Sequence, residues 1–138
     1  MAIQKSSTKT ALNLGNFESV VDEKLNSIFQ RLTNNQTTID KSISYALSNP
    51  GKRIRPTLVF LVGDFLGIET SRLESIAGAI ELIHTYSLVH DDLPCMDDDD
   101  LRRGKPTLHK KFNESTAVLA GDALQTLAFN LILDDKNL

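Results

Sequence analysis

The sequence has little cysteine and no long apolar run. Its single cysteine, Cys95, cannot form a disulfide within the chain, and without a second cysteine nearby it gives no zinc-ligand spacing. No uninterrupted run of about 18 apolar residues occurs, and the first 16 residues contain no apolar signal segment. These absences argue against thiol chemistry, a zinc site, a membrane span and a secretory signal, and they predict a cytoplasmic protein.

Strand periodicity and a basic surface are also missing. No segment alternates apolar and polar residues over a sustained stretch, which argues against a sheet. The sequence pI is near 5.5, with no basic stripe and no series of aromatic residues, so a nucleic-acid partner is not expected. With 138 residues, of which 41% are hydrophobic, the chain is sufficient for the core of one globular domain.

Apolar residues recur at helical spacing in five segments, which predict an all-α bundle of mostly antiparallel helices with short connections. The predicted helices cover residues 17–32, 39–47, 56–66 and 71–92, and a last one begins near residue 115. We expect residues 1–15 to form a flexible terminus and residues 16–138 to form one unit. No internal repeat or low-complexity linker divides that unit.

Particular residues predict where these helices begin and end. Pro56 suits the first position of the third helix, because its missing N–H would be unpaired there. Ser71 predicts the start of the fourth helix, with Glu74 as its capping-box partner. Pro94 ends that helix, since the residue before a proline is pushed out of the α region.

The strongest chemical signal is a cluster of aspartates, which occupy six of the ten positions from 91 to 100. On a continuous helix Asp91 and Asp97 would point away from each other. The break at Pro94 lets the loop bring Asp97 back toward Asp91, so that two carboxylates could share one ion. Hard carboxylate oxygens suit Mg²⁺, which commonly binds through one or two carboxylates plus substrate phosphates.

A calcium loop and a solvated acidic turn are the alternatives for the aspartate cluster. A calcium loop of the EF-hand type needs Gly at its sixth position and Glu at its twelfth. Counted from Asp97 these positions hold Arg102 and His109, so the calcium loop fails. A solvated turn stays open on residue types alone.

Cations around the cluster indicate an anionic ligand. Lys52 and Arg55 lie on one turn just before the third helix, where cations oppose the helix dipole unless an anion binds between them. Arg102 and Arg103 could each bond a different phosphate group. His84 lies two helical turns before the cluster, near the same helix face. A surface Lys/Arg pair and a core histidine remain the alternatives for these residues.

Three segments, in this order, resemble the trans-prenyl diphosphate synthases. Residues 51–56 (Gly-Lys-Arg-Ile-Arg-Pro) resemble the upstream diphosphate-binding segment of that family, residues 84–107 its first aspartate-rich motif, and residues 119–124 the helix that follows. The resemblance covers about residues 17–133 and is closest to the bacterial farnesyl type. Pro50 stands where the family often has glycine. The family's second aspartate-rich motif is absent, so the chain is expected to be an N-terminal portion.

The resemblance implies an isoprenoid synthase bundle, of which the chain supplies the first five or six helices. It also implies a Mg²⁺-dependent prenyltransferase that ionises an allylic diphosphate and joins it to isopentenyl diphosphate, giving farnesyl diphosphate. The implied roles are metal binding by Asp91 and Asp97, contact of Arg102 with the allylic diphosphate, and binding of isopentenyl diphosphate by Lys52, Arg55, His84 and Arg103. Tyr86, about one and a half turns before Asp91, is expected to limit product length.

Several alternatives stay open beside this interpretation. A geranylgeranyl diphosphate synthase would share the reaction and differ in product length. A non-catalytic synthase-like subunit would be expected to lose metal ligands, whereas this chain keeps both aspartates. A terpene cyclase would not need Lys52 and Arg55 for a second diphosphate. We expect a homodimer, and we expect the chain to be inactive on its own because half of the metal site is missing.

Overall fold

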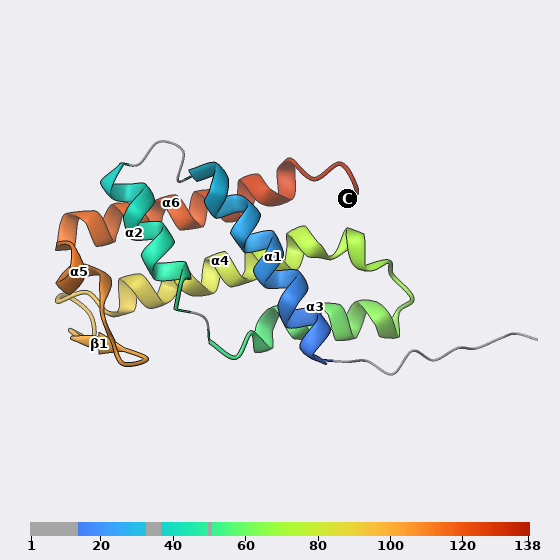
Figure 1. The fold of residues 1–138 in the computed structure, drawn as a ribbon, viewed down its shortest axis with the longest axis horizontal. Coiled ribbons are helices and arrows are strands. Elements are labelled where there is room, and N and C mark those ends of the chain that lie inside the picture. Colours follow the sequence, from blue (N-terminus) through green and yellow to red (C-terminus); the bar gives the residue numbers. More distant parts are fainter. Residues whose placement is uncertain (1–13, 33–36, 50) are drawn as a thin grey trace, which may run out of the picture.

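The described residues, 14–32, 37–49 and 51–138 of a computed structural model, form an all-α fold with one small β-hairpin, which confirms the predicted fold class (Figure 1). The elements are α1 (Leu14–Leu32), α2 (Thr38–Leu47), α3 (Ile54–Phe65), the 3₁₀ turn η2 (Thr70–Arg72), α4 (Glu74–Asp91), β1 (Leu101–Arg102), β2 (Lys105–Pro106), α5 (Leu108–Lys111) and α6 (Glu114–Leu133). Pro50 and most of the segment predicted to be flexible, residues 1–13, lie outside the described residues. Leu14 and Gly15 are helical rather than flexible, because α1 begins at Leu14.

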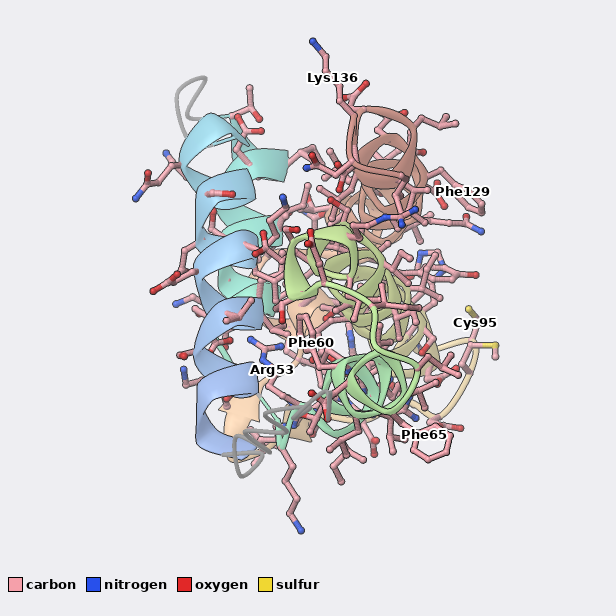
Figure 2. All side chains as sticks on the ribbon, turned by 90° about the vertical axis from the view of Figure 1, so that its right-hand side faces the viewer. Arg53, Phe60, Phe65, Cys95, Phe129 and Lys136 are labelled. Carbon is pink, nitrogen blue, oxygen red and sulfur yellow. The ribbon has the colours of Figure 1, made fainter. Side chains whose placement is uncertain are left out.

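The two long helices α4 and α6 lie side by side and form the most extensive helix contact, with α1 and α2 packed across them (Figure 1). The core between these helices contains fully buried side chains from each of them, including Leu25, Ile43, Leu82 and Leu124. In Figure 2, α1 covers one flank, whereas Phe65, Cys95 and Phe129 project on the other side. Phe65 and Phe129 are 87% and 61% exposed, so that second flank is partly apolar.

Three predicted helix starts are wrong, and the first of them is that of α1, which begins at Leu14 instead of residue 17. The fourth helix begins at Glu74, not Ser71, because residues 70–72 form a 3₁₀ turn and Leu73 is an N-cap without a side-chain bond. The third begins at Ile54, two residues before Pro56. The start predicted near residue 115 is confirmed by α6, whose N-cap Asn113 accepts a hydrogen bond from the Thr116 N–H at 2.8 Å.

The hairpin and the short helix α5 were not predicted. In the hairpin, Leu101 pairs with Pro106 and Arg102 with Lys105, and the turn between them is Arg103-Gly104 with φ of 52° and 77°. Two positive φ values fit the tight turn that matches strand twist. Strands of two residues are too short to show alternation, so only the glycine could have indicated this turn.

Among the described residues, α6 alone is long and apolar enough to cross a membrane by length and composition, with a mean hydropathy of 1.4. The core helix of a soluble protein passes the same test, and 33% of the apolar window of α6 is buried. The expectation that the chain has no spanning segment therefore stays a prediction.

Candidate active site

The loop after α4 turns back on the end of that helix. The Asp97 N–H donates to the Asp91 carbonyl at 2.8 Å, and the Asp98 N–H donates to the Leu93 carbonyl at 3.1 Å. Asp98 has a left-handed φ of 52°, which reverses the chain direction and which Asp tolerates better than most residues. The structure therefore places the backbone of Asp97 against the last turn of α4, where Asp91 lies.

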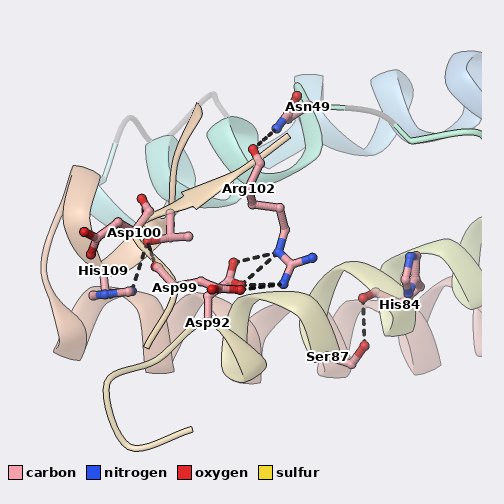
Figure 3. Close-up of polar contacts among 9 residues, drawn as sticks. Asn49, His84, Ser87, Asp92, Asp99, Asp100, Arg102 and His109 are labelled. Atoms are coloured by element: carbon pink, nitrogen blue, oxygen red, sulfur yellow. Dashed lines mark hydrogen bonds and ion pairs between the residues drawn. The ribbon is translucent and has the colours of Figure 1, made fainter. Parts of the chain in front are cut away.

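The aspartates of the cluster fall into two groups. Asp92 is buried and forms an ion pair with Arg102, whose Nε lies 2.9 Å from both carboxylate oxygens (Figure 3). Asp99 lies 3.8 Å from the same guanidinium, and Asp100 pairs with Lys110 at 2.8 Å. Three of the carboxylates are thus already compensated by cations of the chain.

Asp91, Asp97 and Asp98 form the second group, which has no hydrogen-bond or ion-pair partner at the side chain among the described residues. Of these, Asp91 and Asp97 are the pair that the backbone bond of the loop joins. Asp97 is exposed and Asp91 half-buried. Within the same residues, no group of three or more acidic, His or Cys side chains gathers as a metal site would. The pair offers hard oxygen donors and two uncompensated charges, which fits a weakly held Mg²⁺ that needs further oxygen ligands from a substrate.

Arg102 forms more bonds within the protein than the sequence indicated. The Asp92 carboxylate raises the pKa of the Arg102 guanidinium, and the Arg102 carbonyl accepts a hydrogen bond from the Asn49 amide at 3.0 Å. Its Nε and Nη2 bond Asp92, which leaves Nη1 as the edge of the guanidinium available to a phosphate. Asp92, which anchors this side chain, and Asn49, which bonds the Arg102 backbone, were not identified from the sequence.

A groove of about 500 Å³ brings together the four residues predicted to bind the second diphosphate. Lys52 and Arg55 come from the start of α3, His84 from the middle of α4 and Arg103 from the hairpin turn. The Arg103 guanidinium donates to the Asn49 carbonyl at 2.6 Å and lies directly over Gly51, where any Cβ would clash with it. Glycine at position 51 is therefore needed for this close approach.

His84 is electrically neutral in this groove. The Arg55 Nη1 lies 3.2 Å from the His84 Nε2, and since a guanidinium can only donate, Nε2 is the acceptor and the proton is on Nδ1. Burial and then the nearby Arg55 lower the pKa of His84 from its ordinary value of 6.5. The groove thus holds positive charge that is not yet balanced by a ligand.

Arg53 was not identified from the sequence as a site residue, although it stands between Lys52 and Arg55. Its buried side chain bonds Asp22 of α1 and Glu81 of α4. Nothing in the linear pattern distinguishes this arginine from the neighbouring cations. Only the packing of α1 and α4 shows that it faces inward.

An apolar pocket of about 400 Å³ lies between α4 and α6 and begins at Arg55 and His84. Ile80, Ile83 and Ser87 line it on the α4 side; Ala128, Phe129 and Ile132 line it on the α6 side. Tyr86 is not among the lining residues. Its half-buried ring packs edge-to-face on His90, with the ring centroids 5.0 Å apart.

His90 joins the end of α4 to α6. Its Nε2 donates to the Val118 carbonyl at 3.0 Å, and its ring fills the space over Gly121. This contact depends on the missing side chain of Gly121, and it fixes the helix turn that carries Asp91.

We predict that Gly121→Ala lowers the free energy of unfolding by about 1–3 kcal/mol, because its Cβ would clash with the His90 ring and overpack this contact. Gly78→Ala is the matched control: Gly78 also lies within a buried helix face, but its Cβ would meet only a flexible leucine end. Urea unfolding of both variants measures the difference. Equal stability of the two variants would contradict the prediction.

The chain is similar to known proteins over all the residues of the candidate site. A sequence profile of the polyprenyl synthetase family matches residues 36–138. The farnesyl diphosphate synthase of Escherichia coli (strain K12) is 55% identical over 98 residues, which cover 71% of this chain and 33% of that enzyme. That of Bacillus subtilis (strain 168) is 52% identical over 106 residues, covering 77% of this chain and 36% of that enzyme.

Solved structures agree with these relatives. The crystal structure of geranyltranstransferase from Thermotoga maritima superposes with a TM-score of 0.83 at 41% identity, covering 87% of this chain and 44% of that chain. A geranylgeranyl pyrophosphate synthase of Arabidopsis thaliana is also similar in sequence, 56% identical over 92 residues, covering 67% of this chain and 26% of that enzyme. The chain spans about a quarter to just over a third of the length of the curated relatives named here.

Proposed function

Because the chain belongs to the polyprenyl synthetase family, we propose that it is part of a prenyltransferase that joins an allylic diphosphate to isopentenyl diphosphate and forms farnesyl diphosphate. The observation that carries this proposal is the arrangement of three features along α4, from its middle to its C-terminal end. These are the uncompensated carboxylates of Asp91 and Asp97, the cationic groove at His84, and the apolar pocket between α4 and α6.

In the proposed reaction, the cationic groove binds isopentenyl diphosphate. Lys52, Arg55 and Arg103 neutralise its charge, and His84, once protonated, donates a hydrogen bond to a phosphate oxygen. Arg55 and His84 line both the groove and the apolar pocket, so a diphosphate bound in the groove would place the hydrocarbon end of the substrate at the mouth of the pocket. This geometry would hold the double bond toward the pocket that receives the allylic tail.

In the proposed reaction, the C-terminal end of α4, which carries Asp91, binds the allylic diphosphate together with Asp97. Mg²⁺ held by Asp91 and Asp97 would neutralise the charge that develops on this diphosphate as it leaves. Arg102, held by Asp92, presents its Nη1 edge on the same side and adds a directional donor. The double bond of isopentenyl diphosphate then supplies the electron pair of the new carbon–carbon bond, and the resulting cation loses a proton, which the departed diphosphate can accept, to form the new double bond.

The proposal is tested by joining residues 1–138 to the remaining part of the Escherichia coli farnesyl diphosphate synthase. This chimera should convert isopentenyl and geranyl diphosphates to farnesyl diphosphate in the presence of Mg²⁺, detected by chromatography of the hydrolysed products. A chimera that folds and binds both substrates without forming product would contradict the proposed reaction.

A geranylgeranyl diphosphate synthase is the second candidate, favoured by the similarity to the Arabidopsis enzyme. The same product assay separates the two functions, because the chain lengths of the products differ by one isoprene unit.

A homodimer is a further proposal. It is supported by the exposed apolar side chains of α6, including Leu119, Phe129 and Leu133, and is tested by light scattering of the chimera.

Tyr86 remains our candidate for limiting product length. We predict that Tyr86→Ala lengthens the product in the chimera, because removal of the ring opens space beside His90 one and a half turns from the aspartate end of α4. Tyr45→Ala is the control, since it removes the same kind of ring at a position where the hydroxyl bonds the Pro106 carbonyl and the ring does not pack on His90. A Tyr86→Ala chimera that makes only farnesyl diphosphate would rule out this role.

We also predict that binding of isopentenyl diphosphate takes up a proton at His84. The pKa of free His84 lies below 6.5 because of burial and Arg55, and a bound anion raises it. The complex then binds more protons than the free protein between these two pKa values, so affinity falls as pH rises through that window. Calorimetry in buffers of different ionisation enthalpy measures the uptake; uptake that is unchanged in His84→Gln would contradict the assignment.

A further inference from the structure

Arg53 has a backbone conformation that is unfavourable for residues other than glycine. It is the N-cap of α3 and has a φ of 47°, in the left-handed region that residues other than glycine seldom adopt. Its carbonyl starts α3 by accepting bonds from the N–H and the hydroxyl of Thr57, at 3.1 and 2.7 Å. Such a conformation persists only when the surroundings enforce it.

The surroundings that enforce it are two carboxylates from two other helices. The Arg53 Nε and Nη2 lie 3.0 and 2.8 Å from the Asp22 carboxylate of α1, and its Nη1 bonds the Glu81 carboxylate of α4. The side chains of Arg53 and Glu81 are only 6% and 4% exposed. A buried charge pair of this kind is costly to break, because the remaining charge stays buried without a partner.

Asp22, Arg53 and Glu81 form a triad that links two parts of the cationic groove, the start of α3 and the middle of α4. Lys52 precedes Arg53 directly and Arg55 follows it by two residues, so the backbone of Arg53 orients both cations. Glu81 lies one helical turn before His84 on α4 and lines the same groove. One guanidinium thus fixes the start of α3 relative to the helix that carries His84.

We propose that Arg53, which lines the groove but whose guanidinium is held by Asp22 and Glu81, is a positioning residue. It sets the spacing of Lys52 and Arg55 from His84 to match one diphosphate. This inference rests on the proposed function in that the ligand is isopentenyl diphosphate. The Asp22–Arg53–Glu81 triad therefore determines affinity for this substrate, whereas the aspartate end of α4 depends on a separate anchor, Asp92 with Arg102.

The first test is isopentenyl diphosphate binding to the 138-residue chain, measured by calorimetry. Arg53→Met should weaken binding by a factor of about 10 to 100, the loss expected when charged groups are misplaced by about an ångström. Lys24→Met is the matched control, because Lys24 also joins α1 to α4, through Glu74 at 3.8 Å, but lies outside the groove. It should bind as the unaltered chain does.

A double variant separates positioning from stability. Arg53→Met with Glu81→Leu removes both buried charges, so the free energy of unfolding should recover relative to Arg53→Met alone, while isopentenyl diphosphate binding stays weak. In the chimera, the KM for isopentenyl diphosphate should rise by the same factor of about 10 to 100 in this double variant, and the KM for geranyl diphosphate by less than about threefold.

The outcomes distinguish this inference from the function on which it rests. If the unaltered chain binds no isopentenyl diphosphate, the proposed function and the inference both fail. If the unaltered chain binds and the double variant binds equally well, the triad only stabilises the fold and the inference alone is overturned. Equal increases in the two KM values would also overturn it.

Discussion

Replacing Asp97 by Asn should reduce farnesyl diphosphate formation by the chimera by a factor on the order of a thousand or more. The same change should remove the increase in Mg²⁺ affinity that a diphosphate produces. Two carboxylates alone leave Mg²⁺ largely hydrated, so the ion should bind weakly to the free protein and much better when phosphate oxygens complete its shell. Calorimetric titration of Mg²⁺ with and without inorganic pyrophosphate, together with the product assay, measures both effects.

Asp98→Asn is the matched control for this prediction. Asp98 adjoins Asp97 and carries the same charge, but it has a left-handed φ of 52° at which Asn is well tolerated. It should retain near-normal activity. Asp91→Ala should reproduce the loss seen with Asp97→Asn, because both carboxylates are proposed to share one ion. Mg²⁺ binding that is indifferent to pyrophosphate, or to Asp91→Ala, would show that the shared site is wrong.

The sequence predicted the helices well because their apolar periodicity is determined locally. The break after α4 was equally accessible, since Pro94 acts on the residue before it. The predicted start at Ser71 failed for a tertiary reason: Leu73 is buried against the core beside Gly63, and the 3₁₀ turn that delivers it there replaces the expected cap. A residue pattern that permits a cap does not show that the cap forms.

The sequence indicated which residues belong to the candidate site. It did not indicate which of them bind a ligand and which of them bind other residues of the chain. The sequence indicated that Lys52, Arg55, His84 and Arg103 act together, and the structure brings them into one groove. It could not indicate which arginine of residues 52–55 faces inward, because that depends on where the carboxylates of α1 and α4 lie. It likewise could not separate Asp92, whose charge Arg102 neutralises, from Asp91, whose charge is left for a ligand.

The 138-residue chain on its own should form no farnesyl diphosphate at an enzymatic rate, although it should bind isopentenyl diphosphate. Ionisation of an allylic diphosphate spreads negative charge over several oxygens, and Asp91 and Asp97 offer carboxylates at one end of α4 only. Metal on one side of the diphosphate leaves the charge on the other side without compensation. The loss relative to the chimera should therefore reach at least about a thousandfold.

The exposed apolar side chains of α3 and α6, such as Phe65 and Leu133 at 87% and 80% exposure, lead to the same expectation. An apolar pocket open on that flank admits water to any carbocation, whereas the chimera supplies further chain to cover it. The decisive measurement compares product formation by equal amounts of the two proteins with isopentenyl diphosphate, geranyl diphosphate and Mg²⁺. Comparable rates would show that Asp91, Asp97 and Arg102 suffice for ionisation, and that the opposite side of the diphosphate needs no second group of carboxylates.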